Sequence, residues 1–191
     1  MPTGKLWTEM SGKLSTEISG KLWCGISNTI YEKFKDPNCP NIEIVNKMKA
    51  LSDSYTKKNF FFSRQFEEET LWTLYSLQEG VTTIPPDKYR KRGNGSIQFI
   101  ESFFNIKGNE DSLDDISRLA ILSGNASITF DGKYKIHEKE VDGENFKYMT
   151  FNKSKNIEDK PDPKYVKFVD EYFPGTIISA KILFTDDDFT K

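Results

Sequence analysis

The chain has 191 residues, of which 36% are hydrophobic, 14% aromatic and 29% charged, and its formal net charge is −2. Such an aromatic content excludes a disordered chain, and the lack of a basic excess excludes a protein that coats nucleic acid. No apolar run approaches the roughly 20 residues of a membrane-spanning helix, and the N-terminus lacks the apolar core of a secretory signal. We therefore expect an intracellular, cytoplasmic protein without a membrane span.

An eight-residue repeat occupies residues 4–27, written GKLWTEMS, GKLSTEIS and GKLWCGIS. Within the repeat and just beyond it, every fourth residue is apolar: Leu6, Met10, Leu14, Ile18, Leu22, Ile26, Ile30 and Phe34. In a helix, residues four apart form an apolar stripe, which drifts because four residues turn about 400°. The stripe therefore predicts a helix over residues 4–34 that bends or breaks.

The alternative for this segment is a β-meander, because residues four apart also share one face of a strand. Ser11-Gly12-Lys13 and Ser19-Gly20-Lys21 would then be three-residue hairpin loops, and Leu6 would pair with Ile18. The three glycines of the repeat argue against one long helix, since each costs about 1 kcal/mol relative to alanine in a helix interior. Because the apolar stripe continues to residue 34, we prefer the helix.

Two more helices are predicted before residue 80. Asn41 can cap a helix whose apolar positions run from Ile42 to Tyr55. The aromatic-rich segment from Phe60 to Leu77 predicts a buried helix with Glu67 to Glu69 on its wet side, ended by Gly80. Together with the first segment they predict a mainly helical region over residues 1–80.

Residues 81–95 form a predicted linker rich in proline and glycine, which carries the strongest charge cluster of the chain. The cluster consists of Lys88, Tyr89, Arg90, Lys91 and Arg92. Four cations around a tyrosine could bind phosphates and stack a base, or contact an acidic protein surface.

The remaining residues, 96–191, predict an α+β region that can pack with residues 1–80 as one domain. Helices are expected at 96–104, at 112–122 ended by Gly124, and at 163–173. Asp131-Gly132 and Asp142-Gly143 have the turn sequence of hairpins, and residues 176–184 are the longest β-prone run. The predicted fold class is therefore α+β, with a helical N-terminal half followed by a β-β-β-α-β unit and a small, mostly antiparallel sheet.

Few residues suggest catalysis. His137 is the single histidine, and it ends a predicted strand on a wet edge with no nucleophile motif nearby. Glu67 to Glu69 and Asp114-Asp115 point apart on a helix, so neither run forms a carboxylate pair. Cys39 lies in a turn between two prolines and could be exposed, and we expect both Cys24 and Cys39 to be free thiols. No zinc, P-loop or dinucleotide motif occurs, so we expect neither a metal nor a cofactor.

These observations predict a non-catalytic protein-interaction module, of the binding or inhibitory kind, whose partner is another protein. Its expected contact residues are Trp7, Trp23 and the cluster from Lys88 to Arg92, because Trp, Tyr and Arg dominate interaction surfaces. One alternative is a nucleic-acid-binding protein that uses Lys88 to Arg92. A second is a small enzyme that uses carboxylates or His137 for acid–base chemistry. Nothing in the sequence indicates the oligomeric state.

Overall fold

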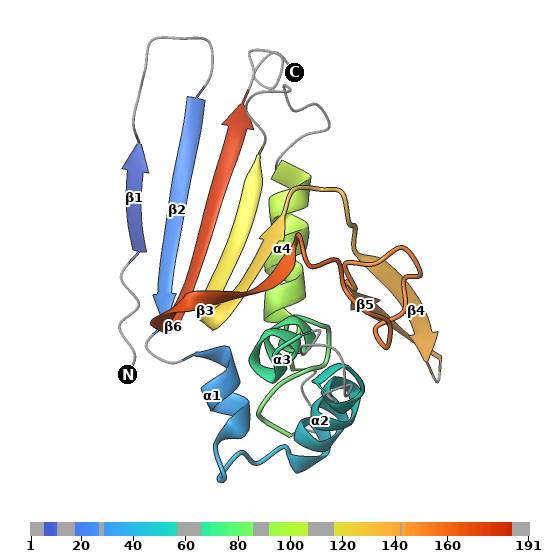
Figure 1. Cartoon of the computed structure of the whole chain (residues 1–191). Coiled ribbons are helices and arrows are strands. Elements are labelled where there is room, and N and C mark those ends of the chain that lie inside the picture. The colour runs from blue at the N-terminus through green and yellow to red at the C-terminus, as the bar shows by residue number, and fades with distance from the viewer. Residues whose placement is uncertain are drawn as a thin grey trace.

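A computed structural model describes residues 6–10, 18–26, 29–56, 66–85, 92–106, 117–141 and 143–184 (Figure 1), with the backbone alone at 6–10, 18–26, 54–56 and 183–184. The helices in this part are α1 (Ile30–Lys35), α2 (Ile42–Thr56), α3 (Glu68–Ser76) and α4 (Gly95–Ile106). The strands are β1 (Leu6–Met10), β2 (Ile18–Ile26), β3 (Arg118–Phe130), β4 (His137–Val141), β5 (Glu144–Tyr148) and β6 (Val166–Phe184). The predicted α+β class, with helices mainly in the first half, is confirmed.

The large sheet has four strands in the order β1-β2-β6-β3, and each neighbouring pair is antiparallel. Strands β4 and β5 form a separate antiparallel hairpin. In Figure 1, α1, α2 and α3 gather at one end of the large sheet, and the β4–β5 hairpin projects on the side away from β1. No helix in the described ranges is long and apolar enough to cross a membrane.

The repeat segment forms strands, so the predicted helix is wrong wherever residues 6–26 are described. The β-meander alternative predicted strands correctly but wrongly placed a hairpin loop at Ser19-Gly20-Lys21. β2 runs straight through Ser19-Gly20-Lys21, and Leu6 therefore lies opposite Cys24 instead of Ile18. The second proposed loop, Ser11-Gly12-Lys13, lies outside the described residues. The fourfold spacing of apolar residues led to the wrong prediction because residues four apart share one face in a helix and also in a strand.

The helices of the first half follow local signals. In α1, Thr29 and Glu32 form a capping box that sequence analysis missed. At α2, the Ile44 N–H donates to Asn41 Oδ1 at 3.4 Å, as the predicted cap requires. α3 begins only at Glu68, and α4 lies within two residues of its predicted limits. Cys39 is buried rather than exposed, with its Sγ 3.9 Å from the Thr83 carbonyl oxygen, because its turn packs against residue 83.

In the second half, the described parts of two predicted helices form strands, whereas residues 112–116 of the first of these helices lie outside the described residues. Residues 118–122 begin β3, and residues 166–173 belong to β6, because the aromatic and β-branched residues there pair with β3. The turn at Gly143 is confirmed, since it joins β4 to β5. The turn at Asp131-Gly132 does not join paired strands. It leads instead into residues 133–136 and then β4.

The hydrophobic core lies between the helices and one face of the large sheet. Side chains alternate along β3, so Leu119 and Ile121 are fully buried, whereas Ala120 and Leu122 are half-buried. On β6, Ala180 belongs to the same core, and Ile178 and Ile182 pack against it. α3 packs against β3, and α1 packs against α3 and β3, whereas β2 contacts β1 and β6. One face of the sheet is therefore the core face, and the alternate positions form the other.

Candidate functional site

The candidate site is the face of the large sheet opposite the core, which we call the outer face. Because residues directly opposite each other in an antiparallel ladder share a face, the register assigns positions to it even where only the backbone is described. Its positions are Trp7 and Glu9 on β1, Lys21 and Trp23 on β2, Ile177, Ser179 and Lys181 on β6, and Arg118, Ala120 and Leu122 on β3. Four strands thus contribute to one surface.

An aromatic row crosses this face. Trp7 lies directly opposite Trp23, Trp23 lies opposite Ser179, and Ser179 lies opposite Ala120. The two tryptophans, 16 residues apart in sequence, are therefore neighbours at the β1 edge of the sheet. The row continues into positions with small side chains, both of them half-buried. Tryptophan is enriched among the residues that dominate the binding energy of protein interfaces, so this row is the candidate contact row of the face.

A charged row lies next to the aromatic row. Glu9 is opposite Lys21, Lys21 is opposite Lys181, and Lys181 is opposite Arg118. Three cations and one anion thus occupy adjacent positions across the four strands. On the other side of the aromatic row, Ile177 lies opposite Leu122. The outer face therefore combines an aromatic row with an aliphatic pair on one flank and an excess of positive charge on the other.

Of the predicted contact residues, the structure brings Trp7 and Trp23 together. Lys88, Tyr89, Arg90 and Lys91 lie outside the described residues. Arg92 is half-buried and lines a hollow of about 290 Å³ with Glu43, Glu79 and Glu144, so it belongs to another surface with acidic neighbours. Sequence reasoning missed the cations of the outer face because they stand on three strands far apart in the chain. Only the pairing register collects them.

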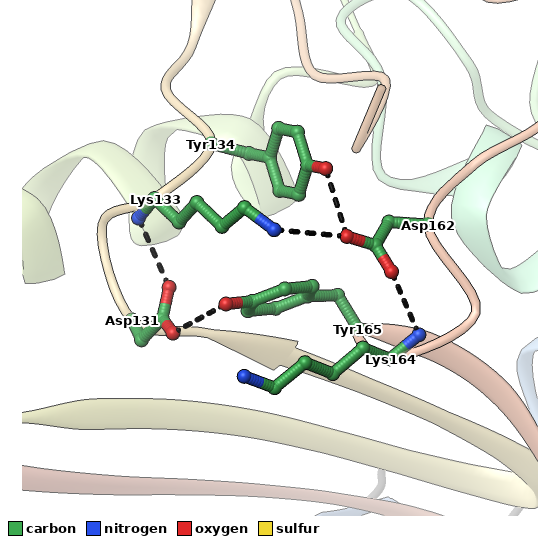
Figure 2. Close-up of polar contacts among 6 residues, drawn as sticks. All are labelled: Asp131, Lys133, Tyr134, Asp162, Lys164 and Tyr165. Carbon is green, nitrogen blue, oxygen red and sulfur yellow. Dashed lines mark hydrogen bonds and ion pairs between the residues drawn. The ribbon is translucent and has the colours of Figure 1, made fainter. Parts of the chain in front are cut away.

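A second polar arrangement, the Tyr–Asp cluster, consists of Asp131, Lys133, Tyr134, Asp162 and Tyr165 (Figure 2). Tyr134 donates its hydroxyl hydrogen to Asp162 Oδ2 at 2.9 Å, and Lys133 Nζ lies 3.0 Å from the same oxygen. Tyr165 donates to Asp131 Oδ2 at 2.9 Å. The ammonium of Lys133 also lies 4.9 Å from the centre of each tyrosine ring.

The electrostatics of the Tyr–Asp cluster follow from these contacts. The pKa of the Asp162 carboxyl is lowered, first by the Lys164 backbone N–H that donates to it and then by Lys133 and Tyr134. The pKa of Tyr134 is raised by burial and by its bond to Asp162, and burial together with Asp131 raises that of Tyr165. Both carboxylates are thus engaged within the protein. The cluster fits a structural connection between two turns better than an acid–base pair.

The other candidates for acid–base chemistry are scattered. His137 is half-buried against the Tyr148 ring at 5.8 Å, and its pKa is lowered by burial and by the charge of Lys155. Glu69, placed on a wet helix face by sequence analysis, is instead half-buried and accepts the Asn125 backbone N–H at 3.0 Å. Burial raises the pKa of Glu69. Within the described ranges, no three His, Cys, Asp or Glu side chains converge to hold a metal ion.

Fold and site together define an α+β protein whose four-stranded antiparallel sheet has its core on one face and a mixed aromatic and basic surface on the other. Comparison of the chain with models of protein families, with curated proteins and with solved structures gave no match.

Proposed function

We propose that the protein is a non-catalytic, intracellular interaction protein that binds an acidic protein surface through its outer face. The single observation that carries this proposal is the register that places Trp7 opposite Trp23 and, in the next row, Lys21 opposite Lys181. Tryptophan supplies much of the binding energy at protein interfaces, and a basic rim selects an acidic partner and speeds its association.

Charge argues for a protein partner rather than a nucleic acid. The whole chain has a net charge of −2, so it lacks the overall basic excess that attracts a polyanion such as a nucleic acid, and its positive charge on this face is confined to one row. The aliphatic pair Ile177 and Leu122, which flanks the aromatic row, would also lie against sugar and phosphate in a nucleic-acid complex. An acidic protein surface with apolar side chains at its centre matches all three rows.

To test this proposal, a library of random 12-residue peptides is selected for binding to the full-length chain. The affinity of the enriched peptides is then measured by fluorescence anisotropy. We expect enrichment of peptides with acidic and apolar residues, and binding that weakens about 10-fold or more in Trp23→Ser and in Arg118→Glu. Phe168→Ser and Lys167→Glu are matched controls, because both residues are exposed on the other half of β6, and these variants should bind normally.

Two results would overturn the proposal. One is a selection without enrichment, or with losses as large in the two controls as in the outer-face variants. The other is binding of a 20-nucleotide oligothymidylate that weakens steeply with salt and depends on Trp23 and Arg118, which would establish the nucleic-acid alternative instead.

A further inference from the structure

A groove that is separate from the outer face lies between α2 and the β4–β5 hairpin. Its volume is about 670 Å³, which falls within the range of about 300–1,000 Å³ typical of small-molecule sites. The floor is apolar and comes from three elements far apart in sequence: Ile44, Met48 and Leu51 of α2, Phe146 and Tyr148 of β5, and Ile157. We call this cavity the hairpin groove.

The polar groups around the hairpin groove are few and mostly basic. Lys47, Lys139 and Lys155 line it, against one acidic residue, Glu158. Lys47 is paired with Glu43 at 2.6 Å on the surface of α2. Lys139 and Lys155 are exposed, and neither has an ion-pair partner in the part of the chain that the structure describes. The groove therefore offers an apolar floor with two available cations at its rim.

The hairpin side of the groove is held firmly. The Lys147 ammonium lies 2.6 Å from Glu101 of α4, and the Lys147 backbone N–H donates to Glu79. Both polar atoms of Gln78, which lines the groove, are hydrogen-bonded: its Nε2 donates to the Leu74 carbonyl, and its Oε1 accepts the Met149 N–H at 2.7 Å. Because these bonds fix the hairpin against the helices, little conformational freedom remains to be lost on binding.

The loop that carries Lys155 is held as well. Asn152 donates to the Asn156 and Asp159 carbonyls and accepts from Thr150 and Ser154, so one amide closes the whole loop. Phe151 and Lys155 both have left-handed backbones, with φ of 55° and 59°. The Phe151 ring is buried beside Tyr134 and Tyr165 of the Tyr–Asp cluster (Figure 2 shows the two tyrosines). Residues that their surroundings hold in such rarely populated backbone conformations often occur at ligand-binding sites.

We propose that the hairpin groove binds a small organic anion with a linear apolar body, a fatty-acid-like carboxylate. The carboxylate lies at the rim with Lys139 and Lys155, and the alkyl chain covers Met48, Leu51 and Phe146. A neutral or cationic amphiphile gains the same apolar burial but loses the two ionic contacts. Selectivity for the anion is therefore the property that distinguishes this site from a merely apolar depression.

The experiment titrates the full-length chain with decanoate, and separately with decyltrimethylammonium, by calorimetry below the micellar concentration of each. We expect decanoate to bind more tightly, and the double variant Lys139→Gln/Lys155→Gln to weaken it about 10-fold, since each partly exposed ionic contact contributes a factor of roughly 2–5. Binding of decyltrimethylammonium should not weaken in this variant.

Two further variants complete the test. Val141→Asp places a negative charge on the rim at a residue that is 43% exposed, so it should weaken decanoate binding without unfolding the chain. Lys153→Gln removes a charge from the same loop outside the groove and should change nothing. Equal affinity for the two amphiphiles, or decanoate binding that survives both groove variants, would overturn the proposal, as would the absence of decanoate binding.

Discussion

Gly124 stands where the ladder between β3 and β6 changes register. Its φ of 59° is left-handed, which glycine adopts readily and other residues adopt only with strain. The position also has no room for a side chain, because a Cβ there would overlap the Glu69 carboxylate. That carboxylate accepts the neighbouring Asn125 N–H. Gly124 thus lets α3 bind directly to the backbone of the strand, a role quite different from the helix end that its sequence context predicted.

Gly124→Ala should lower the free energy of unfolding by roughly 2–3 kcal/mol. About 1 kcal/mol comes from the left-handed backbone, and the rest from displacing Glu69 and losing its bond to Asn125. For a chain of this size the melting temperature should fall by roughly 5–10 °C. Urea titration followed by circular dichroism measures the change.

Gly95→Ala is the matched control, because an added Cβ at this exposed helix residue meets nothing within 4 Å. We expect it to be neutral or to stabilise the chain slightly, by up to about 1 kcal/mol. If Gly124→Ala and Gly95→Ala have the same free energy of unfolding, Gly124 does not have the role described above.

At the scale of elements, β6 shows how a strand can contain a proline. Between Gly124 and Ala126 of β3, the partner positions on β6 move from Phe173 to Phe168, so several β6 residues bulge out of the ladder. Pro174 follows this bulge, where a missing N–H is tolerated. The bulge brings Tyr172 to α1, where its hydroxyl donates to Glu32 at 2.8 Å. From the sequence, residues 163–173 were predicted to be a helix because Pro174-Gly175 is typical of a helix end, and the partner strand β3 could not be known.

The Tyr–Asp cluster joins the turn after β3 to the turn before β6, and its contribution should depend on pH. The folded pKa of Asp162 is lowered, so its stabilisation is present above the ordinary value of 3.8 and is lost as the pH falls through the folded pKa. Asp162→Asn should therefore reduce the free energy of unfolding by roughly 1 kcal/mol at pH 7, a modest value because the carboxylate is partly screened by water.

Urea titrations at several pH values measure this difference, which should narrow as the pH falls below 3.8 and through the lowered pKa of the folded state, where the wild-type carboxyl becomes protonated. Asp159→Asn provides the comparison, since Asp159 is exposed and its backbone, not its carboxylate, makes the bonds seen in this loop. A difference in the free energy of unfolding between wild type and Asp162→Asn that does not narrow at any pH below 3.8 at which the protein is still folded would exclude this origin.

At the scale of the whole molecule, β6 is the strand on which the sheet depends. Its residues 176–184 pair with β2 on one side, and residues 176–181 pair with β3 on the other. Among the described strands, β1 pairs with β2 alone and therefore forms one edge of the sheet. The N-terminal repeat thus supplies the strand that covers an apolar edge of β6, besides supplying the tryptophans of the outer face.

Deleting residues 1–27 should uncover that edge of β6, and unpaired apolar edges associate. We expect this variant to form oligomers or aggregates, measured by size-exclusion chromatography with light scattering. Deleting only residues 1–10 leaves β2 paired with β6 and uncovers only the edge of β2, which contains Gly20, Lys21 and Gly25, so this variant should associate much less than the 1–27 deletion. A 1–27 deletion with the same oligomeric state as the full-length chain would contradict this view of β6.

Only part of the outer face could be predicted from the sequence. Trp7 and Trp23 could be chosen because tryptophans repeated in a polar segment suggest contact, whereas the cations at 21, 118 and 181 could not. Their sequence neighbours are unremarkable, and only hydrogen bonding between distant strands brings them into one row. The hairpin groove could not be predicted from the sequence either, because α2, β5 and residues 155–158 approach one another only after folding.

Local chemistry by itself determined the α+β class, the cap at Asn41, the turn at Gly143 and the β character of residues 176–184, because caps, glycine turns and β-branched runs act over a few residues. Tertiary structure decided whether the fourfold repeat and the segments at 118–122 and 166–173 became helix or strand. Apolar spacing there fits both periods, so the choice depended on the partner that each segment found: β6 for the repeat and for β3, and β3 for the start of β6.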